Sequence, residues 1–453
     1  MGSDTAVMWE SQPLECWGKL KELRRKFVTE MWTAKDRGEL LMMGGTGPLH
    51  AMPAGLGKFH FFGGLGPNFG RIMDDLPLLS KCMDTSEQMG YGPDTCSTLR
   101  CTLGSMFLGE FDINRRTGER LKADFLLENQ VCQAQGKTAQ LWHEYTGVPN
   151  FLIEMPPNME RIDYLLSQLE ESIEFMQRVT GREYHDEWLI EAVENEWEIR
   201  VLWARLSECQ KAIPAPVKQK NLFSFNTIMW RGGRHRQESL DFMRMALAEV
   251  EDRVARKIAG FPAERSRLFH EAAATWYKSP VLSYPERYGA VFMGSHQIFA
   301  GQGAFAVAED GTWTVAPTIK ELGLEIKDRQ SALRALATLY LKYSPGTEGI
   351  LCLEHRVDAR AMLAQEYHVD GVVINNDRGC RGTSVGNMES VLALKRVGIP
   401  VISYEGNVTN PRELDANEYI RRMDSFLESL GLKPLDDAPA ADDETDEGGG
   451  SGH

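Results

Sequence analysis

The chain has 453 residues, of which 42% are hydrophobic and 25% are charged, so it is long enough for two or three soluble domains with separate cores. Its formal net charge of −15 argues against nucleic acid or an anionic membrane as the main partner. There is no run of about 18 apolar residues that would predict a membrane span, and residues 1–10 lack the basic-then-apolar order of a signal peptide. We therefore expect a cytoplasmic protein.

Cysteine usage indicates reduced thiols rather than a disulfide framework. The eight cysteines stand at positions 16, 82, 96, 101, 132, 209, 352 and 380, too widely spread for a compact disulfide pattern. No Cys-x-x-Cys pair occurs, which removes the usual signatures of zinc ribbons and ferredoxins. Any metal bound by these cysteines must be held by residues that lie far apart in the sequence.

The N-terminal region is predicted to form one helix followed by loops and short strands. Apolar side chains recur at a spacing of three to four over residues 11–37, which predicts an amphipathic helix. Residues 44–70 are rich in Gly and Pro and predict loops around short strands. They hold His50 and His60, which are candidates for lining a pocket.

A first cysteine-containing turn follows. Residues 91–107 hold Cys96 and Cys101, and a helix is expected to begin near Cys96, after Gly92-Pro93-Asp94.

A strand–cysteine–helix–strand unit occurs twice in the chain. Residues 122–155 contain a strand, Cys132, a helix and a second strand introduced by Gly-Val-Pro. Residues 370–405 repeat this order around Cys380, with Gly-Ile-Pro before the last strand. Strand-to-helix turns at the carboxyl edge of a parallel sheet are where open α/β folds bind ligands. We therefore expect two domains to offer one thiolate each to a shared site.

Long helical patterns lie between the two units. They cover 158–180, 186–211 and 237–258, and Pro214 and Pro216 end the second of them. We expect these helices to form a layer over the first domain.

Strands and helices alternate again after residue 261, which implies a second parallel sheet. The expected strands are 267–277, 288–293 and 349–353, and the expected helices are 331–343, 359–367 and 417–430.

The predicted fold is α/β, with two Rossmann-like parallel-sheet domains, an N-terminal helical segment and an added helical layer. The expected divisions are an N-terminal helix and loop segment (1–63), a first α/β domain with the helical layer (64–260), a second α/β domain (261–433) and a disordered acidic and Gly-rich tail (434–453).

Cys96, Cys132 and Cys380 differ from the other cysteines in their context. A buried free cysteine is usually a small hydrophobic residue, and Cys16, Cys209 and Cys352 fit that interpretation because each lies within a helix or strand pattern. The other three occupy turns before helices, where backbone N–H groups and the helix dipole stabilise a thiolate. Three thiolates at a domain interface would suit a soft metal centre, above all an iron–sulfur cluster.

The competing chemistry is a single nucleophilic cysteine activated by His296 or His368. The spacing does not place either histidine beside a particular cysteine, so the sequence leaves both kinds of site open.

Several motifs occur in a characteristic order along most of the chain. They are Asp94-Thr95-Cys96, Leu126 to Cys132, Gly147-Val148-Pro149 with Glu154, Arg231-Gly232, Glu264-Arg265-x-Arg267-Leu268, Tyr288-Gly289-Ala290-Val291, Asp370 to Cys380, and Glu405-Gly406-Asn407-Val408-Thr409-Asn410-Pro411-Arg412. With these motifs the chain resembles the iron–sulfur subunits of the 2-hydroxyacyl-CoA dehydratase and benzoyl-CoA reductase superfamily. The resemblance is best over 91–155 and 264–430.

The resemblance implies a 4Fe–4S cluster held between two Rossmann-like domains by Cys96, Cys132 and Cys380. The fourth iron position would be open to water, another ligand or the thioester carbonyl of an acyl-CoA substrate, and Cys101 would be a nearby non-ligand. A separate ATP-hydrolysing iron–sulfur activator would supply one electron, and in the dehydratases a ketyl radical then expels the hydroxyl group. This chain has no Walker A motif, so ATP is expected on the activator alone.

The resemblance also implies a second, homologous subunit, and it leaves the reaction open. A subunit of an ATP-dependent benzoyl-CoA-type reductase is the close alternative to the dehydratase. A non-catalytic electron-transfer or scaffold subunit is a third possibility, and a relative with an enlarged cluster, to which Cys101 would contribute, is a fourth. The region over 40–75 departs from the family pattern, and His50 and His60 are the acid/base candidates within it.

Overall fold

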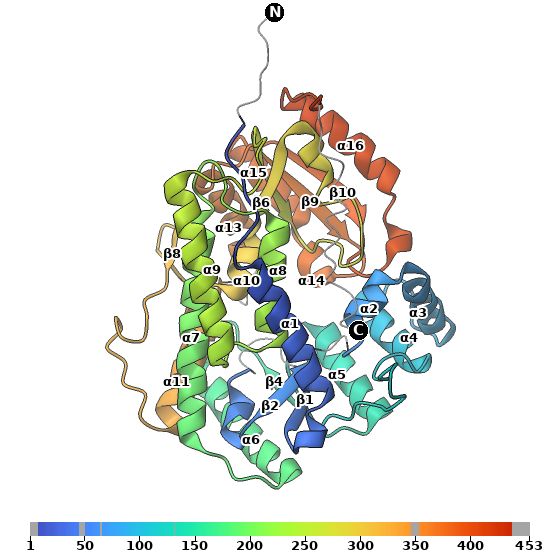
Figure 1. The fold of residues 1–453 in the computed structure, drawn as a ribbon, viewed down its shortest axis with the longest axis vertical. Coiled ribbons are helices and arrows are strands. Elements are labelled where there is room, and N and C mark those ends of the chain that lie inside the picture. The colour runs from blue at the N-terminus through green and yellow to red at the C-terminus, as the bar shows by residue number, and fades with distance from the viewer. Residues whose placement is uncertain (1–7, 45–49, 64–65, 131, 346–352, 437–453) are drawn as a thin grey trace, which may run out of the picture.

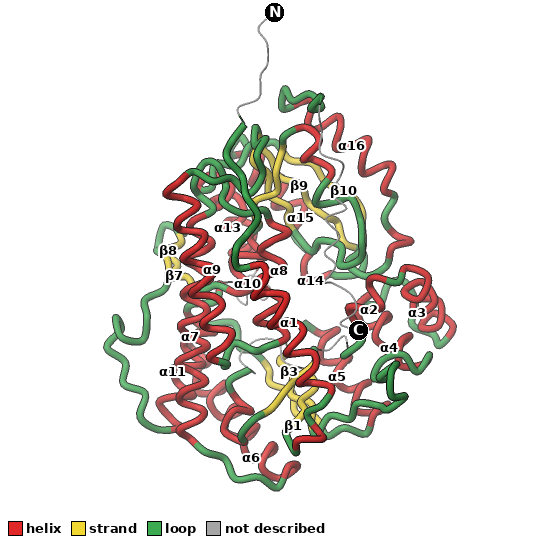
Figure 2. Tube along the Cα trace, in the orientation of Figure 1, coloured by secondary structure: helices red, strands yellow, loops and turns green. Residues whose placement is uncertain are grey.

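The structure, a computed structural model, describes residues 8–44, 50–63, 66–130, 132–345 and 353–436. Two separate parallel sheets lie inside the molecule, one toward each end (Figure 1). Helices and loops surround both sheets (Figure 2). In this described part of the chain, no helix is both long and apolar enough to cross a membrane.

The first sheet contains four parallel strands in the order β2-β1-β3-β4. Their bounds are β1 Leu40–Gly44, β2 Phe59–Phe62, β3 Phe125–Gln130 and β4 Asn150–Glu154. Both faces of the sheet are apolar, because Leu40 and Met42 belong to one core cluster while Leu41 and Met43 belong to another. This pattern is typical of parallel sheets that helices cover on both sides.

The second sheet repeats the topology of the first, with parallel strands in the order β10-β9-β5-β6. Their bounds are β5 Ser266–Glu271, β6 Ala290–Gly294, β9 Gly371–Asp377 and β10 Val401–Gly406. When the four strands of each sheet are numbered by their order in the chain, their spatial order is second, first, third, fourth. This order starts from β2 in the first sheet and from β6 in the second. Cys132 follows the third strand of the first sheet, and Cys380 follows the third strand of the second. The predicted α/β fold with two parallel-sheet domains is confirmed.

The remaining elements are helices and one antiparallel hairpin, β7 Phe305–Val307 with β8 Trp313–Val315. The helices up to the second sheet are α1 Trp17–Trp32, α2 Phe69–Asp74, α3 Leu76–Gln88, α4 Ser97–Phe107, α5 Gln133–Thr146, α6 Ile162–Thr180, α7 Asp186–Cys209, α8 Gln219–Arg231 and α9 Gln237–Arg256. Those that follow are α10 His296–Gln302, α11 Arg329–Lys342, α13 Leu353–Glu366, α14 Arg381–Ser384, α15 Asn387–Arg396 and α16 Ala416–Ser429. Short 3₁₀ turns are Lys35–Arg37, Met52–Leu56, Met159–Arg161, Tyr284–Tyr288 and Pro411–Glu413.

The helical layer covers both sheets, which corrects the expectation that it lies over the first domain alone. α6 packs on the first sheet, but Phe225 of α8 and Phe242 of α9 share a core cluster with Phe269 and Ile374 of the second sheet. Conversely, α11 lies after β5 and β6 in the sequence, yet Leu336 packs into the core of the first sheet. The apolar face of each helix, rather than its place in the sequence, decides which sheet it covers.

The long helix α7 belongs to both cores. Its N-terminal half supplies Leu189 and Trp197 to the core of the first sheet, and its C-terminal half supplies Trp203 and Leu206 to the core of the second. At about 1.5 Å per residue, its length is sufficient to connect the two cores.

The N-terminal segment supplies two strands to the first sheet. β1 and β2 pair with each other, and β1 pairs with β3, so the expected division between residues 63 and 64 falls within the domain that this sheet forms. The helix expected over 11–37 begins only at Trp17, because the backbone of Ser11 pairs with Ala259 in a short bridge. Of the strand expected over 349–353, residues 349–352 lie outside the described residues.

The last expected helix forms as α16, and its apolar face packs on the second sheet. Most of the expected disordered tail, residues 437–453, also lies outside the described residues.

The helical hairpin of α3 and α4 contacts both domains. Cys82 of α3 and Cys101 of α4 pack with Tyr277, which follows β5 in the second domain. On the other side of the hairpin, Leu103 of α4 packs with Leu141 of α5 in the first domain. Cys96 directly precedes α4, the second helix of the hairpin, so the hairpin places Cys96 at the interface between the two domains.

Ion pairs hold the same hairpin against the second domain. The buried guanidinium of Arg100 lies 3.2 Å from Glu87 and 3.9 Å from Glu413. Arg412 donates to Glu87 at 2.8 Å and also pairs with Asp84. Because a buried charge that loses its partner costs several kcal/mol, the Arg100 pair with Glu413 makes the docked position of the hairpin specific, whereas the exposed Arg412 pairs contribute little.

We predict that Gly104→Ala loosens the hairpin. A β-carbon at Gly104 would lie 1.9 Å from the carbonyl oxygen of Cys82, so α3 and α4 would have to separate. Overpacking of this kind destabilises by about 1–3 kcal/mol. Gly18→Ala is the matched control, because Gly18 is also helical and has nothing within 4 Å of such a carbon. Urea denaturation followed by circular dichroism should show a lower midpoint for Gly104→Ala only, and equal midpoints would contradict this account of the packing.

Candidate metal centre

Each of the three candidate cysteines stands at the N-cap of a helix. Cys96 precedes α4, Cys132 precedes α5 and Cys380 precedes α14. The cysteine side chains make no capping hydrogen bond, but backbone N–H groups of the first helical turn lower the pKa of each thiol, those of Thr98 and Leu99 for Cys96, those of Ala134 and Gln135 for Cys132, and that of Thr383 for Cys380. These donors, with the positive end of each helix dipole, favour sulfur in its anionic form.

The structure brings the three cysteines together. The turn of Cys96 and the turn of Cys380 are directly joined, since the backbone N–H of Ser97 donates to the carbonyl of Gly379 at 3.1 Å. Electrostatic effects connect all three sulfur atoms, because Cys132 raises the pKa of Cys96, Cys380 raises that of Cys132, and Cys96 raises that of Cys380. The three thiols therefore converge on one place between the two sheets.

Burial raises the pKa of all three thiols above that of a free cysteine, and it outweighs the opposing backbone donors. Without a metal the thiols are therefore protonated at neutral pH. A metal centre bound here must displace these protons.

The arrangement fits a cluster better than a single ion. No three His, Cys, Asp or Glu side chains in the described part of the chain are close enough together to hold one metal ion. In an iron–sulfur cluster each thiolate binds a different iron, so the cysteine sulfurs lie farther apart than the ligands of one ion do. Thiolates are the donors that iron–sulfur clusters take, so the three thiols have the donor chemistry for such a cluster.

The other described cysteines have packing roles. Cys101 and Cys82 lie in the apolar core of the α3–α4 hairpin, and burial raises the pKa of the Cys101 thiol well above its usual value. Cys16 and Cys209 pack in or against the core of the second sheet. Cys352 lies outside the described residues.

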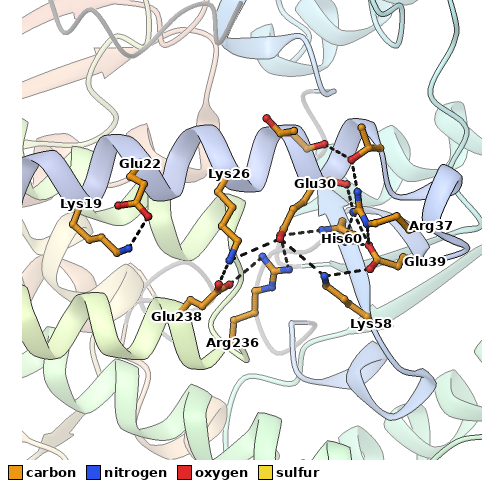
Figure 3. A network of polar contacts seen from close by, with 12 residues as sticks. Lys19, Glu22, Lys26, Glu30, Arg37, Glu39, Lys58, His60, Arg236 and Glu238 are labelled. Carbon is orange, nitrogen blue, oxygen red and sulfur yellow. Dashed lines mark hydrogen bonds and ion pairs between the residues drawn. The ribbon is translucent and has the colours of Figure 1, made fainter.

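His60 lies at the opposite edge of the first sheet from Cys132. It stands beside Leu41 in the strand register, and Leu41 is hydrogen-bonded to Asp124 at the start of β3. The six residues of β3, which follow Asp124, rise about 20 Å, and Cys132 comes after the end of that strand. The His60 ring points to Glu39, at 2.7 Å, and to Glu30 on α1, within an ion-pair network (Figure 3). The structure therefore does not bring His60 to the cysteines.

His50 is fully buried between the first sheet and the loop before α9. Its ring packs against Phe61 at 4.5 Å, and its Nδ1 accepts a long hydrogen bond of 3.5 Å from the backbone of Arg234. These contacts are structural in kind.

The two histidines that could have activated a nucleophilic cysteine lie in different places. His368 precedes β9, so the length of that strand separates it from Cys380. His296 follows β6 and lies at the same edge as Cys380, but burial, with Arg360 and Arg356, lowers its pKa to about 3. The structure gives neither histidine a hydrogen bond to a described cysteine.

Sequence analysis missed a buried ionic cluster at the carboxyl edge of the second sheet. Glu271 ends β5 and lies 3.1 Å from Arg360 of α13, and it also accepts the backbone N–H of His296 at 2.7 Å. Arg356, one turn before Arg360, donates to two carbonyls of the chain around α14. The spacing of four between two arginines on a helix, with a glutamate at the end of a strand, was the available signal.

Comparisons with known proteins identify the family. The family model described as 2-hydroxyglutaryl-CoA dehydratase, D-component, matches residues 78–430. The chain belongs to this family. The matched region includes all three candidate cysteines and both strand–cysteine–helix–strand units, and so the resemblance read from the motifs is confirmed.

Individual relatives are distant but extend over most of the chain. The (R)-phenyllactyl-CoA dehydratase alpha subunit of Clostridium sporogenes is 24% identical over 77% of this chain and 80% of its own length. The lactoyl-CoA dehydratase subunit alpha of Anaerotignum propionicum is 23% identical over 77% and 81%. A benzoyl-CoA reductase subunit of Thauera aromatica is 23% identical over 77% and 79%.

We predict that Gly379→Ala prevents assembly of a metal centre although every cysteine is retained. A β-carbon at Gly379 would lie 2.1 Å from Oγ of Ser97 and 2.6 Å from Nδ2 of Asn407, and both of these side chains are fully buried. The turns of Cys96 and Cys380 would have to move apart. Iron bound after anaerobic reconstitution should fall at least several-fold.

Gly382→Ala is the control for this substitution. It lies in the same turn, and nothing is within 4 Å of the added carbon, so iron binding should match that of the unmodified protein. Full iron content in Gly379→Ala would show that the close approach of the two turns is not required.

Proposed function

We propose that this protein is the 4Fe–4S-containing subunit of an ATP-activated radical 2-hydroxyacyl-CoA dehydratase, which eliminates water from an acyl-CoA thioester. The observation that supports this most is the convergence of Cys96, Cys132 and Cys380 from three helix N-termini in a chain of this family. Two of the relatives are named as alpha subunits of dehydratases that act on 2-hydroxyacyl-CoA thioesters.

The residues of the chain would hold the cluster as follows. Cys96, Cys132 and Cys380 would each bind one iron, and the backbone donors of α4, α5 and α14 would stabilise the three thiolates. When bound, such a cluster supplies one electron and a Lewis-acidic iron that has no cysteine ligand. The protein supplies two sheet edges that face this position, and these edges are where open α/β folds bind ligands.

The proposed partners follow from the same assignment. A second, homologous subunit is proposed because the named dehydratase relatives are alpha subunits. The electron is proposed to come from a separate ATP-hydrolysing iron–sulfur activator, because this chain has no Walker A motif. The substrate is proposed to be an acyl-CoA.

An aryl-CoA reductase of the benzoyl-CoA type is the second candidate. The benzoyl-CoA reductase relative matches this chain over almost the same share of its length, with nearly the same identity, as the dehydratase relatives do. A non-catalytic electron-transfer or scaffold role is the third.

We predict that Cys380→Ala loses most of the iron and acid-labile sulfide of the anaerobically purified protein. The variant removes one of three thiolates, and a cluster held by two is exposed to loss. Cys209→Ala is the control, because Cys209 is a partly buried cysteine at the end of α7 that packs against the core of the second sheet. Both variants should be folded by circular dichroism. Equal iron content in the two would refute the ligand assignment.

The reaction itself can be identified by titrating the reduced complex with thioesters. We predict that a 2-hydroxyacyl-CoA changes the EPR signal of the cluster and is converted to the enoyl-CoA with no net consumption of reductant. Benzoyl-CoA with stoichiometric consumption of reductant would favour the reductase. A signal that no acyl-CoA changes would favour the scaffold, and absence of iron after reconstitution would remove the proposal altogether.

A further inference from the structure

The short helix α14 is held at both ends. Cys380 occupies its N-cap, and the Cys380 carbonyl accepts hydrogen bonds from the side chain of Thr383 at 3.2 Å and from its backbone N–H at 3.3 Å. At the other end, the guanidinium of Arg356 donates to the carbonyls of Gly382 and Val385. A cation at the C-terminal end of the turn matches the orientation of its carbonyl groups.

Arg356 carries a buried charge that no carboxylate in contact neutralises. Its exposure is 5%, and its nearest buried acid, Glu271, is already paired with Arg360 at 3.1 Å. In the part of the chain that the structure describes, no ion pair joins Arg356 to an acidic side chain. Two buried guanidinium groups therefore share one buried carboxylate.

The group left to balance the Arg356 charge is the Cys380 sulfur, which becomes a thiolate when it binds metal. Arg356 lies against the turn that begins at Cys380, through the carbonyls of Gly382 and Val385. Burial, with Arg360 adding to the effect, lowers the pKa of Arg356 to about 10, so the side chain still carries its charge at neutral pH.

We infer that Arg356 is the positioning residue of the Cys380 turn and the buried counter-charge of the metal centre that this turn helps to hold. The inference rests on the proposed function for its second half only. The guanidinium fork fixes the turn whether or not metal is present, whereas its charge stabilises the electron that the reduced centre gains.

Arg378 provides the contrast that makes this inference specific. It is only two residues from Cys380, but its side chain is 63% exposed and is paired with Glu405 at 2.9 Å. Water and this carboxylate screen its charge, so it should act weakly on the centre. If closeness in the sequence decided the effect, Arg378 would matter more than Arg356.

The charge is tested by EPR-monitored redox titration of the reconstituted protein. In Arg356→Gln the ratio of reduced to oxidised centre at a fixed potential should fall about tenfold, which is 59 mV for one electron. Arg356→Lys keeps the charge, and Arg378→Gln removes only a screened one, so both should stay within about twofold of the unmodified protein. An unchanged ratio in Arg356→Gln, or an equal fall in Arg378→Gln, would overturn the counter-charge.

The positioning is tested on metal-free protein, so that it does not depend on the cluster. Alkylation of each cysteine by iodoacetamide is followed by mass spectrometry. Cys380 should react at least fivefold faster in both Arg356→Gln and Arg356→Lys, because a single ammonium cannot replace the two-carbonyl fork, while Cys132 should react at its original rate. Unchanged Cys380 reactivity in the folded Arg356→Lys variant would overturn the positioning role.

The two measurements separate the possible failures. If the unmodified protein binds no iron, the proposed function is wrong, and so is the counter-charge role of Arg356. The alkylation result still decides the positioning role. If iron is bound and only the redox ratio is unaffected, the proposed function stands and the counter-charge is wrong.

Discussion

The close approach of two turns, one from each domain, is the constraint on which the rest of the site depends. The backbone N–H of Ser97 reaches the carbonyl of Gly379, and the absence of a side chain at Gly379 is what allows this contact. The contact needs the α3–α4 hairpin to be docked on the second domain, which Arg100 secures through Glu413. Residues far from the sulfur atoms therefore decide whether Cys96 and Cys380 share a site.

Two of the three cysteines occupy matching positions in the two sheets. In each sheet the third strand in chain order is an inner strand, and it leads to a cysteine at a helix N-cap. A parallel sheet presents the ends of its strands at one edge, and ligands bind where the strand order reverses. Cys132 and Cys380 are equivalent positions in two similar sheets, whereas Cys96 comes from the α3–α4 hairpin, outside the repeated unit.

Local sequence patterns were sufficient for the repeated unit and for the three cysteine turns, because a strand, a turn and a helix are each specified by neighbouring residues. The same patterns could not show which sheet a helix covers. Phe225 and Phe242 are apolar residues on helices that follow the first sheet, but they pack against Phe269 of the second. The helices α2, α3 and α8 were not expected at all, and His60 looked like a loop residue although it lies on β2 in an ion-pair network. Partners of buried charges, such as Glu271 for Arg360, also depend on tertiary contacts that spacing does not reveal.

The dual membership of α7 has a mechanical consequence. Trp197 of α7 is packed in one core and Trp203 is packed in the other, so this single helix connects the two domains rigidly. Opening the two domains like a hinge would require one of these indole rings to slide out of close packing, which interiors at crystal-like density resist. The packing of α7 in both cores therefore constrains the relative orientation of the two domains.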